Sequence, residues 1–149
     1  MRRLVLWLAA AFVPAAIGAL FPAPEYYRRL RKPDWAPPPA VFGPVWSVLY
    51  TLMGIAAWLV ARRGGPGAAP ALRLWGLQAA LNAAWTPIFF GLRSPGGALV
   101  EIAATLAAIG ATVLAFFRRD PAAGLLLLPY LAWVGFATAL NYEVWRRNR

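Results

Sequence analysis

Residues 121–145 read PAAGLLLLPYLAWVGFATALNYEVW, a stretch with a single acid that is long enough to cross a lipid bilayer as one helix. Four more apolar runs precede it, at residues 4–21, 43–61, 72–91 and 97–117. A helix rises about 1.5 Å per residue and needs about 20 residues to cross the hydrocarbon core. The sequence therefore predicts an all-α integral membrane protein with a bundle of five transmembrane helices.

The composition agrees with a membrane location and excludes several kinds of chemistry. Hydrophobic residues make up 61% of the chain and charged ones 13%, against roughly 25% charged in a soluble domain. The net charge of +10 comes from residues at the ends of the runs, where they anchor to lipid phosphates, so we expect no nucleic-acid partner. The chain has no Cys and no His, so we expect no metal site and no conventional catalytic set. Glu101 is the one candidate acid inside a run, and we expect it to lie in the first turn of its helix and snorkel outward.

We expect residues 1–149 to form a single domain, with two points of topology open. Arg2-Arg3 and the first run resemble a secretory signal peptide whose removal would leave four spans, but the run is longer than a usual signal core and we expect a retained helix. Basic residues number seven on one predicted side and eight on the other, so the positive-inside rule gives no orientation. The excess of Arg over Lys, with many Ala, Gly and Pro, indicates a bacterial genome and thus a multi-pass protein of a bacterial cell membrane.

The connection between the first two runs, residues 22–42, differs from a plain linker. It is rich in proline, which stiffens a segment, and it carries Tyr26, Tyr27 and Trp35 as packing groups. Long loops with their own packing residues frequently act as lids, and we predict that this one covers the mouth of the bundle. An interfacial aromatic belt would also account for the three aromatic residues.

Polar and aromatic side chains inside the runs share helix faces. Amides in hydrocarbon must be hydrogen-bonded, and an indole N–H needs an acceptor, so these faces turn inward. The pattern fits either a flat aromatic cavity or a closed core with interhelical hydrogen bonds. Pro14, Pro87 and Pro129 each remove a helical hydrogen bond and predict kinks. The shared faces hold Trp46, Tyr50 and Met53; Gln78, Asn82 and Trp85; and Tyr130, Trp133, Ala137 and Asn141.

Small residues repeat at four-residue spacing in two of the runs, which allows helices of two chains to approach closely. Gly76, Ala80 and Ala84 lie off the face of Gln78 and Asn82, and we predict a homodimer through this stripe. The rival stripe is Ala103, Ala107, Ala111 and Ala115.

Several short motifs are spread over nearly the whole chain. They are residues 32–38 (KPDWAPP), 42–46 (FGPVW), 49–50 (LY), Gln78, Asn82, Trp85, Pro87, 89–91 (FFG), 129–133 (PYLAW), 140–142 (LNY) and 145–148 (WRRN). In order and spacing they resemble the signature of the translocator protein family, also called tryptophan-rich sensory proteins (TspO), in a bacterial member.

This resemblance implies five tightly packed helices, commonly dimeric, with a first loop that closes a pocket for porphyrins such as protoporphyrin IX. It implies a sensor or scavenger of tetrapyrroles in porphyrin and stress regulation, with the porphyrin as ligand and no obligatory cofactor. Two alternatives stay open: a light- and oxygen-dependent porphyrin-degrading enzyme with Trp46 and Trp133 as oxidisable partners, and a transporter of porphyrin or of lipophiles such as sterol. Leu140, Tyr142 and Arg146 resemble a sterol-type motif. The pocket residues that the resemblance implies are Trp35, Trp46, Tyr50, Gln78, Asn82, Trp133, Ala137 and Leu140.

Overall fold

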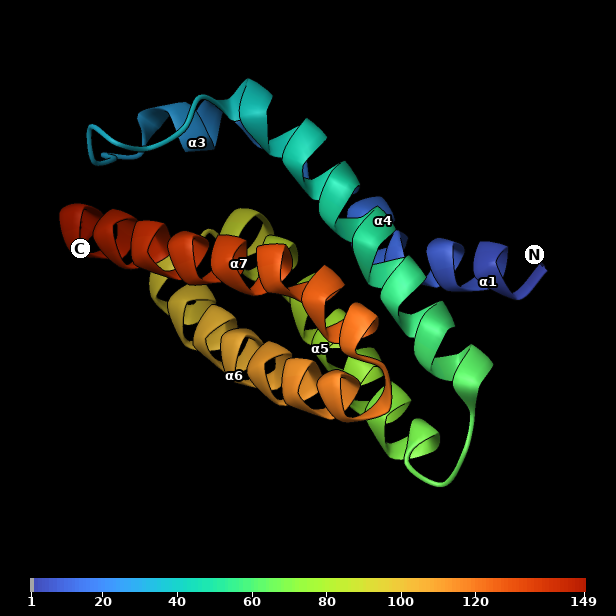
Figure 1. The fold of residues 1–149 in the computed structure, drawn as a ribbon. Coiled ribbons are helices and arrows are strands. Elements are labelled where there is room, and N and C mark those ends of the chain that lie inside the picture. Colours follow the sequence, from blue (N-terminus) through green and yellow to red (C-terminus); the bar gives the residue numbers. More distant parts are fainter. Residues whose placement is uncertain (1) are drawn as a thin grey trace.

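A computed structural model describes residues 2–149, and this range is helical without strands. The helices pack in a ring in which α1 contacts α4, α4 contacts α7, α7 contacts α6, α6 contacts α5, and α5 contacts α2 (Figure 1). The elements are α1 (Arg2–Ala11), α2 (Val13–Gly18), α3 (Pro24–Arg29), α4 (Pro39–Arg63), α5 (Ala68–Thr86), the π-helix η1 (Pro87–Gly91), α6 (Pro95–Arg119) and α7 (Pro121–Asn148).

Within residues 2–149, three helices are long and apolar enough to cross a membrane, namely α4, α6 and α7. The N-terminal apolar helix, Arg3–Gly18, is shorter. The three long helices cover the predicted runs 43–61, 97–117 and 121–145 and extend beyond them. The architecture is therefore all-helical with three clear candidate spans.

Two of the three prolines predicted to kink a helix coincide with breaks. Pro14 lies in the first turn of α2, just after α1 ends at Ala11. At Pro87 the α-helix gives way to η1, where the N–H of Leu92 donates to the carbonyl of Pro87 at 2.9 Å. Proline has no N–H to donate to the preceding turn, which accounts for both changes. Pro129 leaves α7 continuous.

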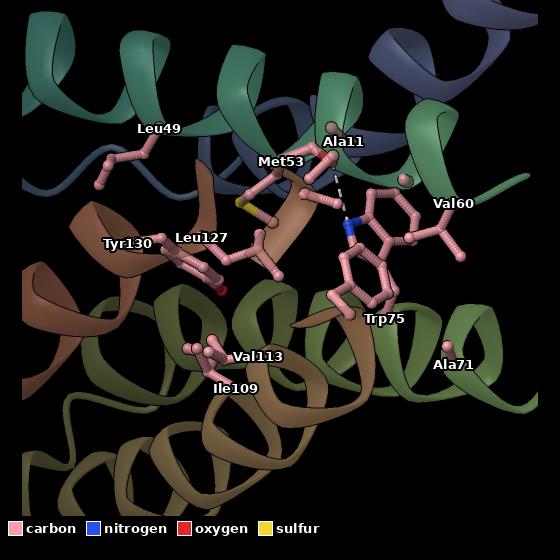
Figure 2. Close-up of a cluster of buried hydrophobic side chains, with 14 of the residues drawn as sticks. Ala11, Leu49, Met53, Val60, Ala71, Trp75, Ile109, Val113, Leu127 and Tyr130 are labelled. Atoms are coloured by element: carbon pink, nitrogen blue, oxygen red, sulfur yellow. Dashed lines mark hydrogen bonds between the residues drawn. The ribbon is translucent and has the colours of Figure 1, made fainter. Parts of the chain in front are cut away.

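A cluster of buried apolar side chains packs between the helices (Figure 2). Met53 is fully buried there beside Leu127 and Tyr130. The indole N–H of Trp75 on α5 donates to the carbonyl of Met53 on α4 at 3.2 Å, which ties these two helices together. Met53 therefore belongs to the packed core.

The first connection is folded and lies at the end of the bundle where α7 terminates. It forms the short helix α3, and its extended part bonds to the side chain of Asn148 through the backbone of Arg31 (Figure 1). The Lys32 ammonium donates to the carbonyl oxygens of Tyr27 and Leu30, at 2.7 and 3.1 Å, and so closes the turn after α3. The bonds between Arg31 and Asn148 hold the connection against the end of α7.

Candidate ligand-binding site

A cavity of about 710 Å³ lies between the helices of the bundle, next to α3. Side chains from α2, α3, α4, α5, η1, α6 and α7 line it, so nearly the whole chain contributes. Small-molecule sites usually measure about 300–1,000 Å³ and combine apolar walls with a few polar groups. The aromatic residues of the wall are Tyr27, Phe42, Trp46, Tyr50, Trp85, Phe90 and Trp133.

Six of the eight residues predicted for the pocket line this cavity. They lie on three helices, α4, α5 and α7, whose inward faces converge there, and their part in binding stays a prediction. The six are Trp46, Tyr50, Asn82, Trp133, Ala137 and Leu140.

The other two predicted residues lie outside the cavity. Gln78 is 1% exposed, and its amide accepts from the Tyr130 hydroxyl at 2.6 Å and donates to the Trp75 carbonyl at 2.9 Å. Gln78 is thus bonded within the core and lies outside the cavity although Gln78 and Asn82 share a helix face. Trp35 is 48% exposed and packs its ring on Phe136, with 5.6 Å between centroids.

Asn82 connects the cavity wall to that buried pair. The Tyr50 hydroxyl donates to Oδ1 of Asn82 at 3.1 Å, and Nδ2 of Asn82 donates to the Tyr130 hydroxyl at 2.7 Å. Every polar atom of the Asn82 side chain is therefore engaged in one chain of bonds across α4, α5 and α7. Such a satisfied network holds the amide in one orientation and rigidifies the wall.

Trp85 and Asn141 form a second polar connection. The Trp85 indole N–H donates to Oδ1 of Asn141 at 2.9 Å, and Nδ2 of Asn141 donates to the carbonyl of Pro95 at 2.9 Å. The pair joins α5, α7 and the start of α6 beside the cavity. Trp85 also stacks on Phe89, with 4.7 Å between centroids, so η1 is fixed to this wall.

Two charged side chains border the cavity, Arg28 from α3 and Glu101 from α6. Arg28 pairs with Glu25 at 3.1 Å, and both side chains are exposed. The expected place of Glu101 was wrong: it lies in the second turn of α6 and points to the bundle interior. Its Oε1 accepts from the Thr105 hydroxyl at 3.0 Å. Glu101 and Thr105 are four residues apart on an apolar helix, and this spacing could have indicated that both face the bundle interior.

No motif in the sequence predicted that the first run also lines the cavity. Pro14, Ala15 and Gly18 on α2 line the cavity, and the Gly18 position is close to Thr86 of α5. Small residues at three- and four-residue spacing leave room beside a helix, and they were the available signal.

The model of the TspO/MBR family matches residues 4–146 of this chain. The chain belongs to the TspO/MBR family. It is 44% identical over 142 residues to the tryptophan-rich sensory protein of Cereibacter sphaeroides, covering 95% of this chain and 89% of that protein. It is 48% identical over 127 residues to the human translocator protein, covering 83% and 75%. Protein CrtK of Rhodobacter capsulatus is 38% identical over 145 residues, covering 96% and 91%.

Family membership and the apolar helices together identify a multi-pass membrane protein.

The sterol-type motif of this TspO/MBR protein does not form one site. Leu140 lines the cavity, whereas Tyr142 is 45% exposed on the other side of α7 beside Trp145. Arg146 pairs with Glu143 at 2.6 Å on the outside of the helix. Leu140 and Tyr142 are two residues apart and therefore face different sides of a helix.

Both small-residue stripes of the protein face outward. Gly76 and Ala80 are exposed on α5, and a Cβ atom at Gly76 would meet open space. In the stripe on α6, Ala103, Ala107 and Ala111 are exposed and Ala115 is half-buried. A homodimer through either stripe stays a prediction.

Proposed function

We propose that this protein binds a tetrapyrrole of the protoporphyrin IX type in a bacterial cell membrane and acts as a sensor or scavenger. The observation that carries the proposal is the cavity of about 710 Å³ with aromatic side chains on α3, α4, α5, η1 and α7. A porphyrin is a large, flat, apolar ring, and it gains from stacking on indole and phenol rings. Names of relatives such as tryptophan-rich sensory protein support a sensory role without naming the ligand.

The polarity of the cavity favours one orientation of the ring. Arg28 borders the cavity on the side of α3, and Arg29, Arg31 and Lys32 follow it in the same connection. Guanidinium and ammonium groups form charge-assisted hydrogen bonds with carboxylates. The propionates of the porphyrin would therefore lie at this mouth, with the ring between Trp46 and Trp133.

The first connection acts as a lid in this proposal, and five spans surround the ligand. The helix α1 with α2, and α5 with η1, complete the count of five when each broken helix crosses the bilayer once. Ligand entry then requires the segment between α3 and α4 to move.

The ligand need not carry a metal. The chain contains no His and no Cys, and Met53 is in the packed core, so haem iron lacks the usual axial ligands. We expect metal-free protoporphyrin IX to bind about as well as haem.

Light-dependent breakdown of the porphyrin is the second candidate, because Trp46 and Trp133 border the cavity. Light and oxygen would supply the reactivity, and an indole would be the oxidisable partner. Replacing Trp133 with Phe should then suppress any loss of porphyrin absorbance under illumination.

The test is a titration of the purified protein with protoporphyrin IX in the dark and in the light, followed by absorbance and tryptophan fluorescence. Saturable quenching in the dark supports binding, and bleaching in the light alone supports degradation. No saturable change in either condition contradicts the proposed function.

A further inference from the structure

Three buried side-chain atoms have no hydrogen-bond partner within the part of the chain that the structure describes. They are the hydroxyl of Tyr27, Nε1 of Trp133 and Oε2 of Glu101. All three residues line the cavity. Buried polar groups in folded proteins are nearly always paired, and these three atoms are covered by their surroundings. Their coincidence on residues of one cavity favours a ligand that turns these side chains inward and supplies the missing partners.

Two of these atoms are donors, and both belong to rings that pack against Phe42. The rings of Tyr27 and Trp133 contact the Phe42 ring with centroid distances of 6.3 and 6.0 Å. An indole N–H only donates, so this wall of the cavity calls for an acceptor on the ligand.

Glu101 differs from the other two because it is a carboxylate. The Thr105 hydroxyl donates to its Oε1, and among residues 3–149 no basic side chain forms an ion pair with it. Its Oε2 is covered by its surroundings, and a rotation of the flexible side chain would turn this atom toward the cavity. An unpaired carboxylate away from water is costly, and an N–H donor or an ammonium group on a ligand removes that cost.

We propose that Glu101 determines specificity by selecting flat lipophilic ligands that carry an N–H donor or a protonated amine. The ligand would present this donor to Glu101 on α6 and an acceptor to Tyr27 or Trp133. The inference rests on the proposed function only in placing the ligand in the same cavity, and it extends the ligand class to nitrogen-bearing aromatic cations.

The test compares two fluorescent probes with the same fused ring system. The aminoacridine is 9-aminoacridine, which is cationic at neutral pH and has an exocyclic N–H donor, whereas acridine is neutral and has none. We expect the purified protein to bind the aminoacridine about tenfold more tightly, which is the lower end of the contribution of a hydrogen bond to a charged group.

The variant Glu101→Gln removes the charge and keeps the shape of the side chain. It should lose about tenfold in affinity for the aminoacridine and stay within about twofold for acridine. The matched control is Glu143→Gln, because Glu143 forms its ion pairs on the outside of α7, and it should bind both probes like the wild type. Since Gln keeps the shape of the side chain and the oxygen that accepts from Thr105, the unfolding temperature of Glu101→Gln should not fall.

Equal losses for both probes in Glu101→Gln, or no preference for the aminoacridine in the wild type, would overturn the role of Glu101. A protoporphyrin IX titration of the same samples separates this result from the proposed function. Discrimination between the probes together with no porphyrin binding would support the role of Glu101 and contradict only the tetrapyrrole proposal.

Discussion

Arg31 and Asn148 are joined by a reciprocal pair of hydrogen bonds. The backbone N–H of Arg31 donates to Oδ1 of Asn148 at 2.9 Å, and Nδ2 of Asn148 donates to the Arg31 carbonyl at 2.8 Å. The residues are 117 positions apart in the chain, so the pair fastens the first connection to the last turn of α7. It is the most direct link between the proposed lid and the bundle.

Asn148→Ala should loosen this fastening. Two exposed hydrogen bonds contribute about 0.5–1.5 kcal/mol each, so amide exchange of residues 30–38 should become about tenfold faster or more, while exchange in the core helices stays the same. Hydrogen–deuterium exchange followed by mass spectrometry measures this. Arg149→Ala is the control, because Arg149 lies over the Trp145 ring at 5.2 Å, and it should leave exchange in the connection unchanged. Unaltered exchange in Asn148→Ala would contradict the link.

Gln78→Met should affect stability and leave ligand binding intact. The change leaves the buried Tyr130 hydroxyl without its acceptor, which costs about 1–3 kcal/mol of unfolding free energy. Asn82→Leu should lower both the stability and the affinity for protoporphyrin IX, because Asn82 borders the cavity. Equilibrium unfolding in detergent and ligand titration check the two readouts. Strongly reduced affinity in Gln78→Met would place Gln78 in the binding site.

The contrast between Gln78 and Asn82 shows how far the sequence carries the prediction. Helical periodicity identifies the inward face of each helix. Trp46, Asn82, Trp133 and Ala137 lie on these faces, and all four line one cavity. Periodicity does not show how deep a side chain lies between two helices, and Gln78 is bonded to Tyr130 and Trp75 outside the cavity. Depth within a bundle depends on side chains from other helices, which no single run encodes.

The first connection shows the same limit for irregular segments. Its prolines and aromatic residues predicted a folded segment, and α3 with the Lys32 bonds is such a segment. The exposure of Trp35 could not be predicted, because it depends on the contact of its ring with Phe136 of α7. The breaks at Pro14 and Pro87 followed from the missing N–H, whereas the π form of the turn after Pro87 does not follow from it.

Ala80→Leu should dissociate the homodimer if the stripe on α5 is the interface. A bulky side chain between closely packed helices keeps the backbones apart. The matched variant on the rival stripe is Ala107→Leu, because Ala80 and Ala107 are both exposed alanines. Ala107→Leu should leave the dimer intact. Light scattering of the detergent-solubilised protein reports the mass. Dissociation by Ala107→Leu alone would move the interface to α6.

The ion pair between Arg63 and Asp120 should make stability depend on pH in the acidic range. Nε of Arg63 donates to Oδ2 of Asp120 at 2.8 Å, and this bond, with the cap to the Ala122 N–H, holds the pKa of Asp120 below its usual value. The carboxylate therefore stabilises the folded state fully above the unfolded pKa of about 3.9, and this contribution is lost as the pH falls through the lower folded pKa.

Asp120→Asn isolates this effect, since Asn still caps α7 but does not titrate. The wild type should unfold at a higher temperature than Asp120→Asn near neutral pH, and the gap should shrink below about pH 4. Thermal unfolding over this pH range measures the gap. A gap that grows as the pH falls would contradict the assigned sign.

The affinity of Ala137→Phe for protoporphyrin IX shows whether a tetrapyrrole occupies the cavity. Ala137 lines the cavity one turn from Trp133, and a phenyl ring there would fill the space assigned to the porphyrin. Ala139→Phe is the matched control, because Ala139 is exposed on the same helix. We expect Ala137→Phe to fold normally and to lose most of its porphyrin affinity, with Ala139→Phe binding like the wild type. Normal binding by Ala137→Phe would show that the tetrapyrrole does not occupy this cavity.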